Sequence, residues 1–348
     1  MKKYLHRIVD WEHWPFKLLY APISLVWVWY IIRSGSVWFF TPSNPKLTFG
    51  GMEGEPKKEM YDLLPPELYP ATINVLPSDQ LQSVSGKINA AGIGFPLIVK
   101  PEVGAQGILL RKINNIHELE NYHLKNPVEY IIQALVSYPM EVSIFYYRYP
   151  GQAKGVISGF LHKIPLMVVG NGVDSLESLI RIHPKASKRI RELKQSHHSN
   201  FNRILSNGEK YILNYAANHN RGAQFIDLKN HIDDQLIGLI DKISLELNDF
   251  FYGRYDILCS SIVELKKGNH YSILEYNGCG AEPNHFYDTG YTLIGAYKEI
   301  LKHWKVLFEI SRENHKKGIQ YWSFLKGLLF LRETKRYFRK IRNADKFI

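Results

Sequence analysis

The sequence predicts an α+β fold, because expected strands and helices interleave along the chain without the regular alternation of a doubly wound sheet. Hydrophobic residues make up 45% and charged residues 22% of the 348 positions, a composition that excludes a disordered protein. A chain of this length can form two or three lobes, each with its own core. The sequence contains no internal repeat and no low-complexity tract.

Short apolar runs separated by glycine and proline predict the strands, and apolar residues at helical spacing predict the helices. The expected strands are 95–100, 108–113, 129–133, 141–147, 210–215, 223–227, 255–264 and 271–276. The expected helices are 78–93, 116–124, 185–205 and 233–250.

Residues 1–40 form an apolar segment that we expect to associate with a membrane. Residues 18–32 are almost wholly apolar between Lys17 and Arg33, and fifteen helical residues reach only about 22 Å, short of the roughly 30 Å hydrocarbon core. Three interpretations remain: an interfacial anchor, a true span, or a helix packed on the domain or on a partner. A secretory signal is not expected, because acidic residues follow the basic start and no small-residue cleavage site follows the apolar run.

Three further regions follow from composition. Residues 41–94 are rich in proline and glycine and are expected to be a linker with a reduced N-terminal region. Residues 95–290 form the main domain, and residues 291–348 form a helical basic tail. The net charge is +11, and residues 312–348 carry eleven Lys/Arg against three acidic residues. This cationic, amphipathic tail suits an anionic membrane surface, or a helix packed on the core with a solvated basic face.

Two cysteines, Cys259 and Cys279, make neither a CxxC pair nor a disulfide framework. A reducing compartment and buried thiols are therefore expected.

Oxygen-bearing side chains at the ends of two expected strands predict a magnesium site. Glu275 and Asn277 are two apart on one strand and therefore share a face. Asp256 begins another apolar strand that can lie alongside. Three oxygen ligands together with nucleotide phosphates suit Mg²⁺. The alternative interpretation is a pair of polar strand ends that face solvent.

A lysine beside a glycine-containing turn predicts a phosphate site. Lys100 ends an apolar strand, and the turn 101–107 contains Gly104 and Gly107. Charge and backbone N–H groups at such a place can meet phosphate together. The turn is neither a Walker A loop nor a dinucleotide fingerprint. The alternative is a plain hairpin with an exposed lysine.

An apolar strand that runs into an exposed connection offers backbone groups for an adenine edge. The residues concerned are Gln133, Ala134, Leu135 and Val136. Glu141 follows and can accept from two ribose hydroxyls, although a strand and its loop explain the pattern equally well. Arg221, before a glycine, can clamp an anion, and Lys163 is a second candidate cation. Either cation can instead be a surface charge.

The order and spacing of these motifs resemble the ATP-grasp superfamily over about residues 78–290. The segments are FPLIVKP with its glycine turn, the strand before Glu141, VVGNGVDSLESLI, NRG, YGRYDI and LEYNG. The branch that looks most similar holds D-alanine–D-alanine ligases, ribosomal-protein glutamate ligases and cyanophycin synthetase. The resemblance implies an ATP-grasp fold, in which two α+β lobes clasp the nucleotide. It also implies an ATP-dependent carboxylate-amine ligase that works through an acyl-phosphate with Mg²⁺, or with Mn²⁺ in its place.

The same resemblance implies roles for the matching residues. Lys100 would hold the phosphates under the glycine turn, residues 133–136 would contact adenine, and Glu141 would contact ribose. Lys163 would approach the γ-phosphate and Arg221 would stabilise the acyl-phosphate. The implied Mg²⁺ ligands are Asp256, Glu275 and Asn277.

The sequence departs from the D-alanine ligase pattern after Asn277. A Pro-Gly pair is replaced by residues 278–285, which changes the acceptor pocket and argues against a D-alanine dipeptide product. Glu282 and His285 are our candidates for substrate contacts. Asn171 also replaces the Asp of the family's Gly-Asp-Gly turn.

Two other functions remain open: a nucleotide-binding module without ligation, and a carboxylate kinase that stops after phosphoryl transfer. The expected partners are ATP, small-molecule or lipid-linked carboxylate and amine substrates, and a membrane surface, with no nucleic acid. The expected location is the cytoplasmic side of the inner membrane, peripheral or anchored by the N-terminal segment.

Overall fold

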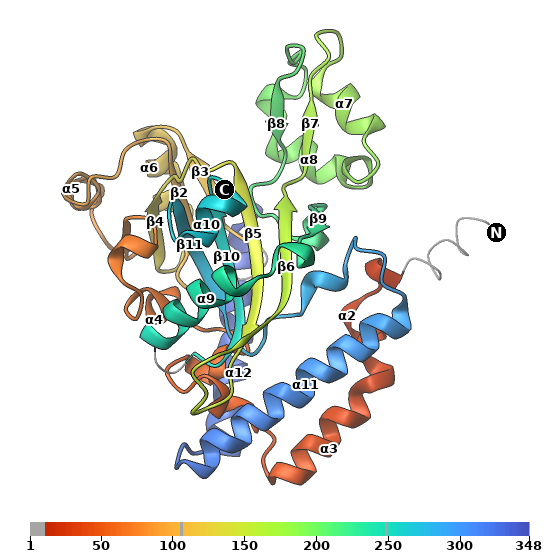
Figure 1. The fold of residues 1–348 in the computed structure, drawn as a ribbon. Coiled ribbons are helices and arrows are strands. Elements are labelled where there is room, and N and C mark those ends of the chain that lie inside the picture. The colour runs from red at the N-terminus through yellow and green to blue at the C-terminus, as the bar shows by residue number, and fades with distance from the viewer. Residues whose placement is uncertain (1–10, 105–106, 248–249, 348) are drawn as a thin grey trace. The chain divides into compact units, whose positions relative to one another are not determined.

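A computed structural model describes residues 11–104, 107–247 and 250–347 (Figure 1). The chain divides into two compact units: one comprises the residues up to His162 and from Asp227 onward, and the other is Lys163–Ile226. Separate sheets and helices build both units, so the α+β class is confirmed, as are an apolar N-terminal helix and a basic C-terminal helix.

Two antiparallel sheets organise the first unit. The smaller has the order β1-β4-β2-β3, and in the larger β11, β10, β5 and β6 are neighbours in that order. The strands of the smaller sheet are β1 (Thr72–Val75), β2 (Leu97–Pro101), β3 (Arg111–Ile113) and β4 (Tyr130–Ala134). Those of the larger are β5 (Met140–Tyr147), β6 (Val156–Ile164), β10 (Tyr252–Cys259) and β11 (Tyr271–Asn277). Strand β9 (Gln224–Asp227) returns the chain from the second unit.

The helices of the first unit cover these sheets and extend beyond them. They are α2 (Phe16–Tyr20), α3 (Ser24–Ser34), α4 (Lys57–Tyr61), α5 (Leu81–Ala90), α6 (Ile116–Lys125), α9 (Asp234–Glu246), α10 (Ile262–Lys266), α11 (Leu293–Lys316) and α12 (Phe324–Ala344). Helices α5 and α6 bury Val84, Ile88, Leu119 and Tyr122 against the smaller sheet. The spacing of these apolar residues is what predicted both helices.

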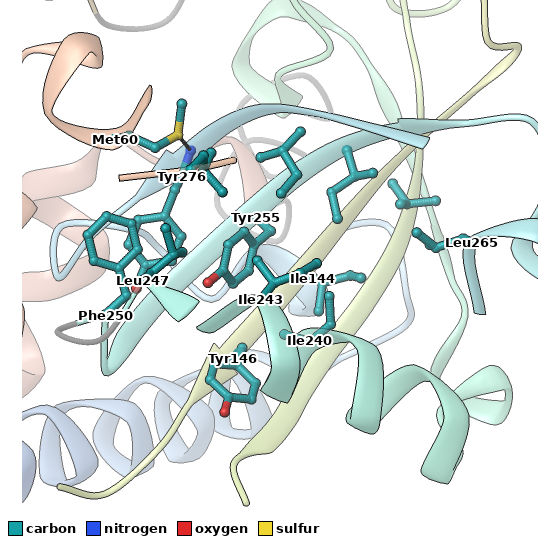
Figure 2. Close-up of a cluster of buried hydrophobic side chains, with 14 of the residues drawn as sticks. Met60, Ile144, Tyr146, Ile240, Ile243, Leu247, Phe250, Tyr255, Leu265 and Tyr276 are labelled. Carbon is teal, nitrogen blue, oxygen red and sulfur yellow. Dashed lines mark hydrogen bonds between the residues drawn. The ribbon is translucent and has the colours of Figure 1, made fainter. Parts of the chain in front are cut away.

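The main core lies between the larger sheet and α9. Residues from β5, β10 and β11 that point to one face of the sheet meet apolar residues of α9 (Figure 2). The members labelled there include Ile144, Tyr255, Tyr276, Ile240 and Ile243. Because side chains alternate along a strand, the residues between them point to the opposite face. Both cysteines are buried and free, and burial raises the pKa of Cys259 to about 11.

The apolar N-terminal helix packs against α11 with one side. Tyr30 stacks on Phe308 with ring centroids 4.5 Å apart, and Trp27 meets Trp304 edge-on at 5.1 Å. The two helices run side by side in Figure 1. Within the described residues, Phe16–Ser34 is the one helical stretch long and apolar enough to cross a membrane, by length and composition alone.

The other side of α3 carries exposed apolar side chains. They are Leu25, Val28, Trp29 and Ile32. Their spacing of three and four residues places them along one stripe of the helix. Residues 1–10 of the expected membrane segment lie outside the described part of the chain.

Helix α12 is amphipathic in the way its sequence predicts. Phe338 and Ile341 are buried with Leu109 in a small apolar cluster. Asp345, just after the helix, accepts hydrogen bonds from the Leu109 backbone N–H at 2.8 Å and from Arg111 at 2.9 Å. Helix α12 therefore packs on the core, and Asp345 after it binds the segment that follows the glycine turn 101–107.

Residues 41–61, expected to be a linker, pack into the first unit. The buried side chain of Asn44 donates to the carbonyls of Gly50 and Tyr252 and accepts from the N–H groups of Phe251 and Tyr252. Its amide is thus satisfied on both sides. The segment also forms backbone hydrogen bonds from Cys279 and Gly280 to Gly50 and Gly51.

Glycine is required where this segment meets the loop after β11. A Cβ at Gly51, whose φ is +73°, would lie 2.7 Å from the Cα of Gly278. A Cβ at Gly280 would lie 1.9 Å from the Met52 carbonyl oxygen. No side chain fits at either distance without movement of the backbone.

The second unit is a small α+β module. Strands β7 (Met167–Val169) and β8 (Lys210–Ile212) pair, and α7 (Leu176–Ile182) and α8 (Ile190–Ser196) pack on them around Val168, Leu176 and Ile180. The expected helical stretch over 185–205 is shorter and interrupted: α8 is flanked by the 3-10 turns Ala186–Arg189 and His198–Asn200. Polar residues end the helix there, since Ser196 Oγ donates to the Glu192 carbonyl and such local bonds compete with helix propagation.

We expect Gly280→Ala to lower the free energy of unfolding by about 2 kcal/mol, because the new Cβ overlaps the Met52 carbonyl. Urea denaturation monitored by circular dichroism measures the change. The control is Gly86→Ala in α5, where nothing lies within 4 Å of the new methyl group. Since alanine favours a helix over glycine, the control gains up to about 1 kcal/mol. Equal stabilities of the two variants would contradict the contact.

Candidate functional site

The pairing of β10 with β11 brings the predicted oxygen donors together. Asp256 lies directly opposite Glu275, and Arg254 lies opposite Asn277. On the other side of β10, Asp256 pairs with Ser143 of β5. Since Tyr255 and Tyr276 belong to the core on the other face, these polar residues share the face away from α9.

A β-bulge interrupts this pairing beside the polar residues. The partner of Asp256 is Glu275 while that of Ile257 is Ile273, so Leu274 has no partner across the ladder. The Leu274 carbonyl instead accepts from the Tyr61 hydroxyl at 2.7 Å and from Lys100 Nζ at 3.3 Å. Bulges commonly re-aim groups next to functional sites, and this one attaches β11 to the lysine at the end of β2.

Asp256 is buried and held by two neighbours. Arg254 reaches both carboxylate oxygens, with Nε–Oδ1 at 3.3 Å and Nη2–Oδ2 at 3.2 Å. Asn277 Nδ2 lies 3.4 Å from the same Oδ2. Arg254 also donates to the Glu282 carbonyl at 3.3 Å. The paired arginine fixes the orientation of this carboxylate.

A cleft in the first unit is lined by Glu275 and Asn277. Its other lining residues are Leu47, Glu55, Pro56, Lys57, Met60, Gly104 and Tyr276. Lys57 Nζ lies 3.5 Å from Glu275 Oε1. Burial acts to raise the pKa of Glu275, but Lys57 and Lys100 outweigh it and the pKa is lowered. The site therefore presents an ionised carboxylate beside two lysine side chains.

Glu55, in the same cleft, has a different charge state. Burial raises its pKa to about 7, although its own backbone N–H and Lys57 act in the opposite direction. A carboxyl group with a pKa near neutrality can both take and release a proton.

Lys100 ends β2 in a buried position, 8% exposed. Its Nζ is 3.2 Å from the Tyr61 hydroxyl in addition to the Leu274 carbonyl. Burial lowers the pKa of Lys100, and the carboxylates of Glu275, Glu102 and Glu141 oppose that shift. Because Lys100 bonds the carbonyl of Leu274, the residue before Glu275, the predicted phosphate lysine lies beside the predicted metal ligands.

Tyr61 of α4 connects the predicted phosphate and adenine residues. Its hydroxyl also accepts from Gln133 Nε2 at 3.0 Å, and Gln133 donates to Thr72 Oγ1 at 2.8 Å. The ring of Tyr69 packs at a tilt against the Tyr61 ring, with centroids 4.7 Å apart. A nucleotide that uses both Lys100 and Gln133 must share them with this phenol or displace it.

The other predicted nucleotide residues lie at the end of β4, on β5 and in the glycine turn 101–107. Ala134 ends β4, and Leu135 and Val136 follow it, all partly buried. Glu141 lies on β5, on the same face as Ser143. Gly104 lies in the cleft near Lys57, while Gly107 has a φ of +72° that glycine adopts without strain. Residues 105–106 of the turn lie outside the described part of the chain.

The two candidate substrate residues have other partners. Glu282 Oε1 accepts from the hydroxyls of Tyr20 at 2.6 Å and Tyr287 at 3.1 Å, which ties it to the N-terminal segment. His285 is buried, with Nε2 3.3 Å from Glu299 Oε1.

The other two predicted cations, Lys163 and Arg221, belong to the second unit. Arg221 lies in a 3-10 turn and pairs with Glu192 Oε1 at 3.2 Å. Lys163 is buried near the end of β6. In the turn before α7, Asn171 Oδ1 accepts from the N–H groups of Val173 and Asp174, so the asparagine side chain stabilises the turn.

Four residues of this site were not predicted from the sequence: Glu55, Lys57, Tyr61 and Arg254. Three of them lie in the segment read as a linker, and no periodic pattern distinguishes them there. Arg254 had a usable signal, since it is two residues before Asp256 and would share its face if the expected strand 255–264 began earlier, as β10 does.

No protein-family model matches the chain. No curated protein matches it either.

Solved structures that resemble the chain are distant. A D-alanine–D-alanine ligase from Bacillus anthracis is 13% identical with a TM-score of 0.42, over 76% of this chain and 69% of that one. A VanG D-Ala:D-Ser ligase from Enterococcus faecalis is 12% identical with a TM-score of 0.42, over 75% and 62%. A bifunctional glutathione synthetase from Pasteurella multocida is 14% identical with a TM-score of 0.38, over 72% and only 36%. This chain thus spans about a third of the length of that glutathione synthetase.

We expect Tyr61→Phe to lower the free energy of unfolding by about 1–2 kcal/mol, because Lys100, Gln133 and the Leu274 carbonyl lose a shared buried partner. Urea denaturation at neutral pH measures the loss. Tyr69→Phe is the matched control: it keeps the ring contact with Tyr61 and changes stability by less than about 0.5 kcal/mol. If both variants lose the same stability, the hydroxyl does not organise the site.

Proposed function

We propose that the chain is an ATP-grasp type ligase that uses ATP and Mg²⁺ to join a carboxylate to an amine through an acyl-phosphate. The observation that carries this proposal is the cross-strand pair of Asp256 and Glu275 beside Lys57 and Lys100. Two carboxylates next to two cations form a site for a metal-bound polyphosphate, because each charge on the ligand meets its opposite.

The donor set fits a hard divalent cation. Asp256, Glu275 and Asn277 offer carboxylate and amide oxygens on one face of the sheet. Asn277 now directs Nδ2 at Asp256, and a half-turn of the amide would present Oδ1 instead. Bound there, Mg²⁺ would neutralise charge on the phosphate oxygens.

The chain's own residues would bind and orient the nucleotide. Lys57 and Lys100 would hold phosphate oxygens near Gly104, residues 133–136 would contact adenine, and Glu141 would accept from ribose. Lys163 and Arg221 of the second unit are proposed to stabilise charge on the transferred phosphoryl group and the acyl-phosphate. Because residues 278–285 replace the Pro-Gly pair of D-alanine ligases, a different acceptor is proposed.

The test is a substrate screen that follows ADP release by protein purified in detergent, with carboxylates and amines supplied separately and together. We expect ADP release to require both substrates. Glu275→Gln should lower the rate at least 100-fold, as loss of one charge-stabilising group commonly does. Glu246→Gln, at an exposed position of α9, should leave the rate unchanged.

Each other outcome rejects part of the proposal. ADP release without an amine indicates a carboxylate kinase, and nucleotide binding without ADP release indicates a non-catalytic module. Unchanged turnover in Glu275→Gln removes the metal assignment.

We also propose that the first unit attaches to the cytoplasmic face of a membrane and acts on a lipid-linked or envelope substrate. The exposed stripe of α3 and the basic residues of α12 support this. Phe324, Leu325, Leu328 and Leu329 are exposed at the start of α12, and Trp38 stacks on Phe324 at 6.4 Å. Since the opposite side of α3 packs on α11, an interfacial anchor fits better than a span.

We expect the protein to float with vesicles of mixed zwitterionic and anionic phospholipid. Leu25→Glu combined with Trp29→Glu should lower partitioning at least tenfold, because burial of each side chain in lipid contributes about 1.5–3 kcal/mol. Leu124→Glu, which alters an exposed leucine on α6, is the control. Recovery of all the protein in the soluble fraction without detergent or high salt would reject the attachment.

A further inference from the structure

Three metal-ligating side chains meet in the first unit apart from the proposed nucleotide site. His285 comes from the short turn Asn284–Phe286, and Glu299 and His303 come from α11. Glu299 and His303 are four residues apart and therefore lie on one face of the helix. Each residue directs one ligand atom inward, and all three atoms lie within 4.8 Å of one another.

The separations match those of ligands around a tetrahedral metal. His285 Nε2 and His303 Nε2 each lie 3.3 Å from Glu299 Oε1. Zinc bonds of 2.0–2.2 Å at the tetrahedral angle put neighbouring ligand atoms about 3.3–3.6 Å apart. Two imidazoles and one carboxylate are also a common donor set for Zn²⁺.

The ring nitrogens lack the hydrogen bonds that buried histidines normally make. Nδ1 and Nε2 of His285 and Nε2 of His303 have no hydrogen-bond partner within the described chain, because the approach to Glu299 has the distance but not the direction of a hydrogen bond. The rings are 6% and 1% exposed. Unsatisfied polar atoms at such burial are costly, so nitrogens that converge on one point indicate a missing ligand.

The groups around the cluster fix the two rings. His303 Nδ1 lies 3.2 Å from the Tyr252 hydroxyl, which leaves Nε2 as the free ligand atom. Phe145 packs edge-on to the His303 ring at 4.4 Å. A Cβ at Gly159 would lie 2.3 Å from His285 Nδ1, so glycine in β6 makes room for that ring.

One competing charge is present. Lys302 Nζ lies 3.3 Å from Glu299 Oε1, and its side chain is 54% exposed. An exposed lysine pair is weak, and this side chain can turn into solvent when a cation takes the carboxylate.

We propose that His285, Glu299 and His303 bind a zinc ion and leave one coordination position for water or an anionic substrate group. Phe145 and Tyr252 alternate with core residues in the same way as Ser143 and Asp256, so the site lies on the sheet face that bears the proposed nucleotide residues. Asn284 Nδ2, beside His285, is 3.4 Å from Ser143 Oγ. This site is independent of the proposed ligase activity, because metal content is measured without turnover.

The experiment measures zinc in untagged protein purified without chelator, by mass spectrometry of the metal. We expect about one zinc per chain, an increase in melting temperature when zinc is returned to chelator-treated protein, and intense visible absorption when Co²⁺ replaces it. Glu299→Gln and His303→Gln should weaken zinc binding at least 100-fold. His123→Gln, at a buried histidine bonded to Tyr130 and Asp79, should retain zinc.

Circular dichroism establishes that each variant is folded, and the near-isosteric Glu299→Gln keeps the test valid if His303→Gln unfolds. Two results would overturn the site. One is wild-type protein without zinc after growth in zinc-supplemented medium and without a thermal shift on zinc addition. The other is zinc content unchanged in Glu299→Gln.

Discussion

The register between β10 and β11 is the constraint on which the site depends. It sets Asp256 against Glu275 and Arg254 against Asn277, and a shift of β11 by one residue would turn Glu275 and Asn277 into the core beside α9. The buried residues Ile273 and Tyr276 oppose such a shift, since they would then face the polar side. Packing on one face thus holds the charges on the other, and the bulge at Leu274 adjusts the strand so that Lys100 reaches its carbonyl.

The parts of the site that the sequence predicts are those with local signals. Lys100 ends an apolar run before a glycine turn, and Glu275 and Asn277 share a strand face, so residue type and period two place them. The apolar residues of 41–61 follow neither a helical nor a strand spacing. The position of this segment depends on long-range contacts such as that of Asn44 with the backbone of Tyr252. Lys57 and Tyr61 were therefore missed. His303 was also missed, because the sequence pattern of its helix indicates only that one face is apolar.

Helix α11 links two parts of the first unit, the apolar N-terminal helix and the proposed zinc site. Helix α11 packs on α3 through Trp304 and Phe308 and carries Glu299 and His303 on the same helix. Glu282, in the loop after β11, accepts a hydrogen bond from the Tyr20 hydroxyl of the N-terminal segment. The N-terminal helices and the residues after Glu275 and Asn277 are thus joined by direct contacts, so the N-terminal helices are packed on the first unit and are not a flexible tether.

The contact of Gly51 with Gly278 limits how this chain can change over evolutionary time. The two backbones approach so closely that neither position can acquire a side chain while the other stays in place. A lineage that replaced one glycine would have to rebuild the whole crossing of the N-terminal segment over the loop beyond Asn277. We therefore expect homologues that share this crossing to retain both glycines, and homologues that lack one to route that segment differently.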